Sequence, residues 1–206
     1  MNVRRINVPI RILLAAILII VPWMVTVSAG SAIQDSAGLQ FSLIDSEGKT
    51  HTQKEWEQSK AVLLFFVGAE CPISNAFAPE INRIHNAYGS KRVSFYIVHS
   101  DPDITKEAAA NHAAEYGYKF TVLLDPKQTL AKKFGVTITP TAVMLTSEGE
   151  PIYRGRIDNR YIALGQKRPE ATQHDLRDAL EATLAGKKVA EPVTKPIGCF
   201  LPGAVK

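Results

Sequence analysis

The stretch GAECPISNAFAPE, residues 68–80, lies between two patterns of different period. Before it, residues 61–67 read AVLLFFV, a continuous apolar run with β-branched and aromatic side chains, which is typical of a strand covered on both faces. After it, apolar side chains recur at helical spacing from Phe77 to Tyr88. The stretch therefore predicts a buried strand, a short turn and a helix, with Cys71 at the start of the helix.

A cysteine in this position is expected to be modestly activated. The first amides of a helix lack carbonyl partners, so they can donate to a thiolate, and the helix dipole favours negative charge there. Pro72 takes the first helical position, where its missing N–H costs nothing. We expect the amides of Ile73 and Ser74 and the Ser74 hydroxyl to point at the Cys71 sulfur, while the neighbouring carboxylate of Glu70 opposes ionisation. The interpretation requires that Cys71 be ionised near neutral pH and reachable from solvent.

Periodicity and turn residues divide the rest of the chain into strands and helices that alternate. The expected elements are a hairpin at 39–52, strands at 61–67, 93–98 and 120–124, helices at 104–117 and 127–135, a hairpin at 141–157, and a helix at 172–186 that Thr172 caps. This order predicts an α/β domain with a central, mostly parallel sheet, an antiparallel edge hairpin and helices on both faces. Ligands of such sheets bind at the carboxyl ends of the strands, where Cys71 falls.

Three features together carry a resemblance to a known fold. Cys71-Pro72-Ile73-Ser74 follows a strand, Pro79 lies eight residues after the cysteine, and Thr139-Pro140 precedes another strand. This set is similar to the active-site helix and the second signature of the thioredoxin-like superfamily. Over residues 39–186 the chain looks most like the redoxin branch, akin to the alkyl hydroperoxide reductase and thiol-specific antioxidant group and to exported thioredoxin-like proteins.

The resemblance implies a thioredoxin-like fold in which Cys71 is the catalytic nucleophile. In relatives the proline before the fourth strand is cis and packs against the reactive sulfur, so we expect a cis bond between Thr139 and Pro140. Such a bond would turn the Thr139 backbone outward, to pair with an extended substrate chain. Thr139, Pro140 and Pro72 are therefore the expected substrate-binding residues, and Ser74 is the expected catalytic neighbour of the sulfur.

Two positions depart from the patterns of related enzymes. Peroxiredoxins carry Thr or Ser three residues before the reactive cysteine, where this chain has Gly68, so a peroxide would lack an expected hydrogen-bond group. Dithiol reductases carry a second cysteine at the position of Ser74, and a hydroxyl cannot form a disulfide. The missing thiol must therefore come from elsewhere.

The chain has only one other cysteine, Cys199, in a tail at residues 187–206. The segment between the last expected helix and Cys199 could extend over about 45 Å, so it can reach the Cys71 site. We hypothesise that Cys199 resolves Cys71 as a second catalytic cysteine, through an intramolecular disulfide. Two alternatives stay open: a permanent structural clip, which would stabilise the fold by about 4–5 kcal/mol in the chain-entropy model, and no pairing.

The first residues differ in composition from the rest. Arg4, Arg5 and Arg11 flank an uncharged run of about 18 residues that ends in small side chains, as in a secretory signal or a membrane anchor. We expect residues 1–32 to be such a segment, and residues 33–186 to form an exported, periplasmic or otherwise extracytoplasmic domain. The formal charge is +4, but 3 of the 24 basic residues and none of the 20 acidic ones lie in this segment. This balance argues against binding of nucleic acid.

The remaining polar residues have simpler interpretations. The five histidines lack the spacing of a ligand set, so neither a metal nor another cofactor is expected. Arg154 and Arg156 alternate on an expected edge strand, where solvated charges are common, although one of them could lower the pKa of Cys71. Asp158 fits a turn better than a proton shuttle.

Three functions are compatible with these patterns. The first is an exported thiol–disulfide oxidoreductase with Cys71 as nucleophile, which would act on a protein thiol or disulfide partner. The second is a thiol peroxidase that reduces hydroperoxides. The third is a non-catalytic module that holds an extended partner chain beside Pro140. Membrane contact is expected only through an uncleaved N-terminal segment, and no nucleic-acid partner is expected.

Overall fold

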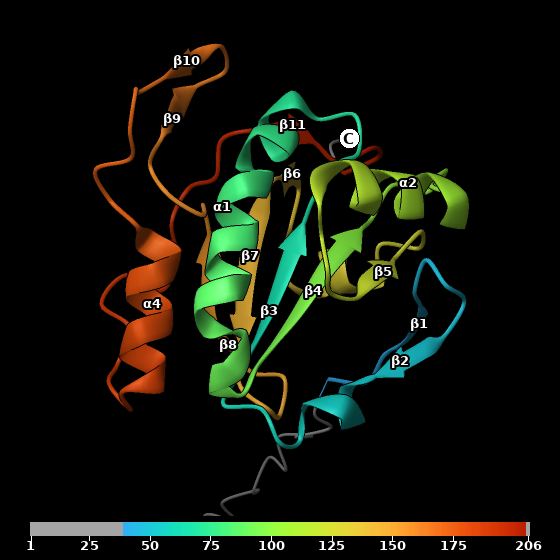
Figure 1. Ribbon diagram of the computed structural model, residues 1–206, viewed down its shortest axis with the longest axis horizontal. Coiled ribbons are helices and arrows are strands. Elements are labelled where there is room, and N and C mark those ends of the chain that lie inside the picture. Colours follow the sequence, from blue (N-terminus) through green and yellow to red (C-terminus); the bar gives the residue numbers. More distant parts are fainter. Residues whose placement is uncertain (1–38, 205–206) are drawn as a thin grey trace, which may run out of the picture. The chain divides into compact units, whose positions relative to one another are not determined.

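A five-stranded sheet forms the centre of the computed structural model, which describes residues 39–204 (Figure 1). The strands are β3 (Ala61–Phe66), β4 (Val93–His99), β5 (Val122–Leu124), β7 (Thr141–Leu145) and β8 (Pro151–Gly155). Their order is β5-β4-β3-β7-β8, with β3, β4 and β5 parallel, β7 antiparallel to β3 and β8 antiparallel to β7. The predicted α/β domain, with its mostly parallel sheet and antiparallel edge hairpin, is confirmed.

Strand β3 is buried along its whole length, as its continuous apolar run predicts. Its side chains alternate between two apolar clusters, Ala61, Leu63 and Phe65 in one and Val62, Leu64 and Phe66 in the other. Each fully buried Leu or Phe contributes about 1.5–3 kcal/mol through removal of its surface from water. The strand is therefore the fixed element from which the Cys71 turn projects.

Helices cover both faces of the sheet. The first cluster joins β3 to α1 (Pro72–Tyr88), α2 (Lys106–Tyr116) and α4 (Asp175–Leu184). The second cluster joins it to α3 (Thr129–Lys133) and to the short 3₁₀ helix η1 (Gln53–Trp56). A second 3₁₀ helix, η2 (Gly89–Lys91), follows α1. This arrangement agrees with the alternating side chains of β3, because each face of the strand packs against a different layer of helices.

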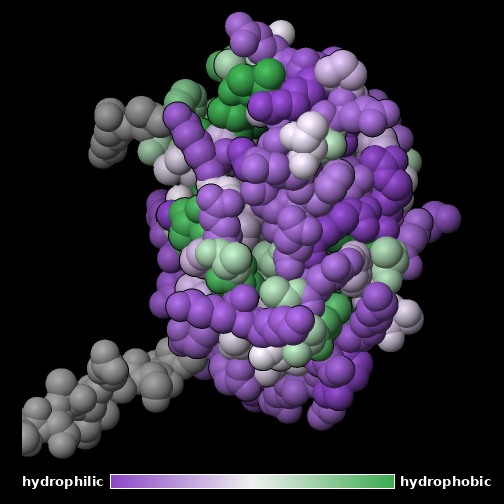
Figure 2. Space-filling model, turned by 90° about the vertical axis from the view of Figure 1, so that its left-hand side faces the viewer, coloured by the Kyte–Doolittle hydropathy of each residue, from purple (hydrophilic) through white to green (hydrophobic). Residues whose placement is uncertain are grey.

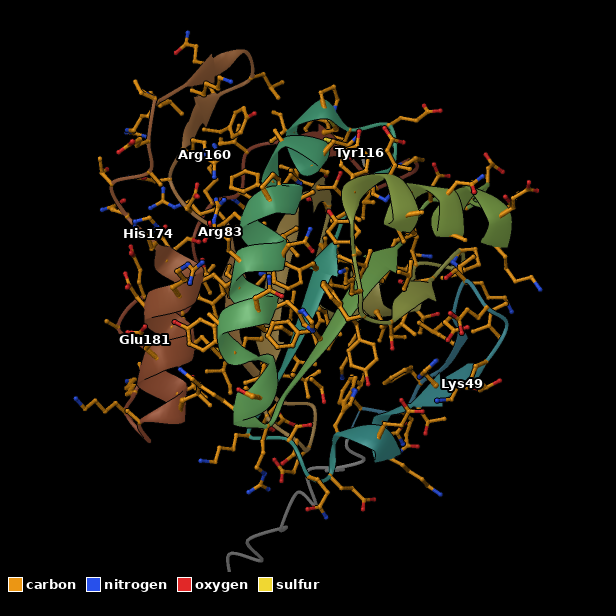
Figure 3. The ribbon with its side chains drawn as sticks, viewed as in Figure 1. Lys49, Arg83, Tyr116, Arg160, His174 and Glu181 are labelled. Atoms are coloured by element: carbon orange, nitrogen blue, oxygen red, sulfur yellow. The ribbon has the colours of Figure 1, made fainter. Side chains whose placement is uncertain are left out.

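Helices α1 and α4 lie side by side and are joined by polar contacts at their margins (Figure 3). The Tyr88 hydroxyl donates to Glu181 at 2.8 Å. The buried Glu80 carboxylate accepts from Arg83 on its own helix and from Arg177 on α4 at 2.7 Å. Burial raises the pKa of Glu80, but hydrogen bonds from Arg177 and Arg83 lower it by more, so the net pKa lies below the usual value for a glutamate. These bonds fix the helix that carries Cys71 against the domain.

Three small pairs of strands complete the domain. They are β1 (Ser42–Ile44) with β2 (Thr50–Thr52), β9 (Tyr161–Ala163) with β10 (Gln166–Lys167), and β6 (Ile138–Thr139) with β11 (Cys199–Phe200). The β9–β10 arm, which sequence patterns did not indicate, extends from the domain near the start of α1 (Figure 1). Ile162 and Leu164 on this arm are 51% and 66% exposed. Figure 2, which views the molecule from the left-hand side of Figure 1, shows hydrophobic side chains at its upper end.

The expected Thr172 cap of the last helix is wrong. Helix α4 begins at Asp175, and its N-cap residue is His174, whose side chain makes no capping hydrogen bond. Thr172 is instead held by Asn159, whose side-chain oxygen accepts from the Thr172 amide at 2.8 Å and whose amide donates to the Thr172 hydroxyl at 2.8 Å. These long-range bonds keep the backbone before residue 175 out of the helix.

The last described residues, 187–204, run back across the domain as one continuous tail segment. The segment first borders β8, where the Arg154 amide donates to Pro192 at 2.9 Å and the Thr194 amide donates to Arg154 at 3.0 Å. It then forms β11 and continues to Leu201, which is buried and whose amide donates to the Thr137 carbonyl at 2.9 Å. The segment thus covers the exposed edge of β8 and reaches the end of the sheet where Cys71 lies (Figure 1).

The expected export segment, residues 1–32, lies outside the described residues, as does the start of the expected domain at residue 33. Within residues 39–204, none of the helices combines the length and the apolar character needed to cross a bilayer.

Candidate active site

Cys71 occupies the turn between β3 and α1 and is the N-cap residue of the helix. Its sulfur accepts a hydrogen bond from the Ser74 amide at 3.4 Å, and its thiol donates to the Thr139 carbonyl oxygen at 3.4 Å. The Ser74 side chain is fully buried, and its hydroxyl accepts from the Gly68 amide at 3.3 Å. Pro72 is the first helical residue and is exposed. The turn therefore holds the sulfur against the free amides of the first helical turn.

Competing influences act on the Cys71 thiol, and their sum favours the thiolate. Burial raises the pKa of Cys71, because a charge is poorly solvated there. Hydrogen bonds from the Cys199 thiol, from the Ser74 hydroxyl and from the amides of Ser74 and Cys199 lower it by more, so the net pKa lies below that of a free cysteine. The prediction is confirmed for the Ser74 amide, which donates to the sulfur at 3.4 Å, whereas the Ser74 hydroxyl accepts from the Gly68 amide at 3.3 Å. The largest lowering of the Cys71 pKa, however, comes from the distant Cys199.

The peptide bond between Thr139 and Pro140 is cis, as expected. The position expected for a substrate chain is occupied by the chain's own β11, in which Cys199 lies opposite Thr139. Gly198 permits this approach, because a Cβ atom there would overlap the Thr139 carbonyl oxygen. The Thr139 hydroxyl also donates to the Cys199 carbonyl at 3.5 Å. The backbone of Thr139 is thus already paired within the described chain.

Cys199 is a free, partly exposed cysteine that lies opposite Thr139, whose carbonyl oxygen accepts from the Cys71 thiol at 3.4 Å. Burial raises the pKa of Cys199. The hydrogen bond to Cys71 and the negative charge of the Cys71 thiolate raise it as well, to about 11. The Ile73 amide opposes these effects and lowers the pKa of Cys199.

The requirement that Cys71 be reachable from solvent is not met in this structure. Its exposed fraction is 4%, and Thr139 is 2% exposed. The reason is the segment at residues 196–200, which lies across the turn and the cis peptide. Sequence patterns placed the tail within reach of Cys71, but they did not indicate that it would cover the sulfur.

Gly68 lies close to both the nucleophile and the cis peptide. A Cβ atom at this position would lie 3.0 Å from the Thr139 hydroxyl oxygen and 3.1 Å from the Cys71 Cβ, tighter than most such contacts. A Ser or Thr here, as in peroxiredoxins, would therefore require neighbouring atoms to shift. The neighbouring atoms of Thr139 and Cys71 therefore leave little room for a side chain at position 68.

Asn75 and His112 also support the site, although sequence patterns did not single them out. The Asn75 side chain donates to the Ala69 carbonyl at 2.9 Å, and its oxygen lies 3.0 Å from the His112 ring nitrogen Nε2. Helix α2 is thereby tied to the loop before Cys71. An Asn in the first turn of a helix, able to bond back to the preceding loop, is the signal that could have indicated this role.

The β9–β10 arm meets the site at its base. The Arg160 guanidinium lies 5.1 Å from the centre of the Phe77 ring and pairs with the buried Asp158 at 3.3 Å (Figure 3). The Asp158 carboxylate also accepts from the Arg160 amide at 2.8 Å, which is the turn role expected for it. Tyr161 packs on Phe77, with ring centres 5.6 Å apart. The arm therefore packs against the first turns of α1, through Phe77.

Arg154 and Arg156 are engaged away from the sulfur. Arg154 donates to the carbonyls of Phe134 and Gly135, and Arg156 forms a two-pronged ion pair with Asp175 at 2.8 and 2.9 Å. Among residues 39–204, no group of three or more His, Cys, Asp or Glu side chains is arranged to hold a metal ion.

Comparisons with known proteins agree with this architecture. The Redoxin family model matches residues 28–171. Thiol-disulfide oxidoreductase ResA of Bacillus anthracis is 31% identical over 112 residues, which cover 54% of this chain and 63% of ResA, so the match spans less than two thirds of that relative. A hypothetical protein from Sinorhizobium meliloti 1021 has a TM-score of 0.70 at 28% identity and covers 80% of this chain and 91% of its own. A candidate thiol:disulfide interchange protein DsbE from Chlorobium tepidum shares the fold, with a TM-score of 0.56 at 22% identity over 71% of this chain and 94% of its own.

Proposed function

Because the chain belongs to the redoxin family of the thioredoxin-like superfamily, we propose that it is a thiol–disulfide oxidoreductase whose redox couple is Cys71 and Cys199. One observation carries the proposal: both cysteines lie against Thr139, beside a cis proline at the start of α1, because the Cys71 thiol donates to the Thr139 carbonyl at 3.4 Å and Cys199 pairs with Thr139 across β6 and β11. Cys199 thereby takes the place of the second cysteine that Ser74 replaces.

The two cysteines have the chemistry that a disulfide couple needs. Cys71 supplies the thiolate, since the amides and hydroxyl around it offset the cost of burying the charge. Closing the Cys71–Cys199 bond removes two electrons and two protons from the pair, and a partner disulfide that accepts them becomes two thiols. In the protonated state the Cys71 thiol donates to the Thr139 carbonyl. Ser74 and Thr139 are thus positioning residues for the sulfur.

The other two functions have less support from the site. A peroxidase would use a hydroxyl three residues before the cysteine, where Gly68 packs against Cys71 and Thr139. A module that holds an extended chain would need the Thr139 backbone to be free, and β11 is paired with it. Both observations favour disulfide exchange over these alternatives.

We further propose that residues 1–32 direct export or anchor the chain, that residues 33–186 form the redoxin domain, and that residues 187–206 supply the second cysteine. The basic flank and apolar run of the first segment support export. A compartment outside the cytoplasm would allow the Cys71–Cys199 disulfide to persist, because the cytoplasmic thiol pool keeps such bonds reduced.

Equilibration of the full chain in glutathione buffers of graded redox ratio tests this function. Intact mass analysis should show an intramolecular disulfide that forms reversibly, and the chain should accelerate exchange with a fluorogenic peptide disulfide. Cys71→Ser and Cys199→Ser should each abolish the disulfide. Faster consumption of hydrogen peroxide than of the peptide disulfide would favour the peroxidase instead. A chain that never forms the Cys71–Cys199 bond would contradict the proposed couple.

A further inference from the structure

The position beside the cis proline is filled by a strand of the same chain. Cys199 pairs with Thr139 across β11 and β6, and Gly198 lies so close to the Thr139 carbonyl that no larger residue fits. A partner chain therefore cannot add to the backbone of Thr139 while the tail remains in place.

The tail is held on both sides of this point. Before it, the Thr194 hydroxyl lies 2.6 Å from the Tyr153 hydroxyl and accepts from the Arg156 amide at 3.0 Å. After it, Leu201 is buried, and the Gln128 side chain donates to the Pro202 carbonyl at 2.7 Å. Because release of the tail would break all of these contacts, the covered state is the one that a partner meets.

The two sulfurs differ in access in that covered state. Cys71 is 4% exposed beneath the tail, whereas Cys199 is partly exposed on it. In a disulfide between the two cysteines, Cys199 would be the residue that solvent partly reaches, and Cys71 would stay buried.

We propose that an external thiol exchanges with Cys199, and that Cys71 is the buried leaving group of the exchange. This inference deepens the proposed function and rests on it, since it concerns the same disulfide. It assigns the tail cysteine as the residue that bonds covalently to the partner, and it assigns a protein dithiol as the class of partner. The usual order, in which the cysteine at the helix start meets the partner, is reversed.

Two successive thiol–disulfide exchanges transfer the electrons. A partner thiolate attacks the Cys199 sulfur of the oxidised chain, a bond forms between the two, and the Cys71–Cys199 bond breaks with its electron pair left on Cys71. A second thiolate of the same partner then attacks its own sulfur in this mixed disulfide. The partner leaves with an internal disulfide, and Cys199 leaves as a thiolate and takes up a proton. The partner loses two electrons and the chain gains them.

The settings of the two cysteines favour this direction. The hydrogen bonds that lower the pKa of Cys71 stabilise it as a leaving thiolate, and thiols of lower pKa leave faster. The raised pKa of Cys199, about 11, leaves few Cys199 thiolates near neutral pH to attack an external disulfide. Both effects favour transfer of electrons from a partner dithiol to the chain.

A rapid-quench experiment on the disulfide form of the full chain tests the assignment. The oxidised chain is mixed with excess glutathione, quenched in acid after short, graded times, and digested with pepsin at low pH, where exchange stops because thiolates are protonated. We expect the glutathione adduct on Cys199 to exceed that on Cys71 by about tenfold at the earliest times. The same disulfide unfolded in guanidinium chloride is the control, and there the two adducts should be close to equal.

Each outcome bears on a different claim. An early adduct mainly on Cys71, or equal adducts in the folded chain, would overturn the assignment and leave the Cys71–Cys199 couple intact. A chain in which the disulfide cannot be formed at all would overturn the couple and the assignment together. A bias toward Cys199 that persists unchanged in guanidinium chloride would also overturn the assignment, because local sequence and not the fold would then cause it.

Discussion

Cys71 and Cys199 are the same side chain in two settings, and the settings act in opposite directions. Cys71 caps a helix and has hydrogen-bond donors from two segments of the chain, so its pKa falls despite burial. Cys199 lies on a two-residue strand, is less enclosed, and has its pKa raised to about 11 by burial and by its neighbour. The difference shows that the number of donors around a sulfur can matter more than its exposure.

The comparison also separates acidity from access. Cys71, which has the lower pKa, is buried. Cys199, which is partly exposed, stays protonated near neutral pH. A single cysteine cannot combine both properties at this site, because the tail that supplies donors to Cys71 also covers it. Division of the two roles between two cysteines follows from this geometry.

Removal of either cysteine should have the largest effect. Cys71→Ser and Cys199→Ser are each expected to lower catalysed disulfide exchange by about three orders of magnitude, and the double variant should be no worse than either, because residues that act as a unit are not additive. Turnover of a fluorogenic peptide disulfide measures this. Full activity of Cys199→Ser would break the comparison, since Cys71 would then need no second thiol.

Gly198→Ala should change access without touching either sulfur. The new Cβ would overlap the Thr139 carbonyl oxygen, so the strand must move away and expose Cys71. We expect alkylation of Cys71 by iodoacetamide to become about tenfold faster, equal to about 1.4 kcal/mol of local opening.

Gly89→Ala is the matched control for that variant. It makes the same chemical change at helical φ, −57°, where the added Cβ meets only ordinary contacts, the nearest at 3.5 Å from the His85 ring. The control should leave the alkylation rate unchanged. If Gly198→Ala behaved in the same way, the tail would not be what limits access to Cys71.

Ser74→Ala should test the cause of the low pKa of Cys71. It removes the hydroxyl that donates to the Cys71 thiolate and leaves the Ser74 amide in place, so the pKa of Cys71 should rise. The rate of iodoacetamide labelling as a function of pH measures the shift, and reactivity at neutral pH should fall several-fold. Ser90→Ala, at an exposed position in η2, is the control. An unchanged labelling profile would assign the low pKa to the other donors.

The pH dependence of stability should show the smallest effect, with opposite signs for the two cysteines. The folded pKa of Cys71 is lowered, so the unfolded chain binds more protons just below the free-thiol pKa, and stability rises with pH there. The folded pKa of Cys199 is raised, so between pH 9 and about 11 the folded chain binds more protons and stability falls. Denaturation of the reduced chain across this range should show both slopes.

The cysteine variants assign these two slopes. Cys199→Ser should remove the fall between pH 9 and about 11, and Cys71→Ser should remove the rise below it. Because each thiol also shifts the pKa of the other, each variant should weaken the remaining slope as well, while tyrosine and lysine titrations are common to parent and variants. A fall that persists in Cys199→Ser would mean that another group causes it.

The local part of the site could be predicted from the sequence because its causes lie within a few residues. The apolar run before Gly68, the helical stripe after Cys71 and Pro72 at the first helical position all act through short-range geometry. The cis bond at Pro140 came from a family resemblance and not from the residues themselves.

The errors share a different cause. The Thr172 cap failed because Asn159, thirteen residues earlier, binds the backbone and side chain of Thr172. The expectation that solvent reaches Cys71 failed because the tail, which comes from far along the chain, covers it. In both cases a contact between distant segments overrode the expectation from local rules.

The sequence alone determined the order of the five central strands and their helices, the capping role of Cys71 and the absence of a second cysteine from its helix, because periodicity and helix-end chemistry depend on neighbours in the chain. Only the tertiary structure decided that β11 fills the place beside Pro140, that Cys71 is covered, and that Cys199 is the more accessible sulfur. The physical reason is that the tail docks through the sum of many weak contacts with β8, β6 and the residues around them, and no single residue in the tail encodes that sum.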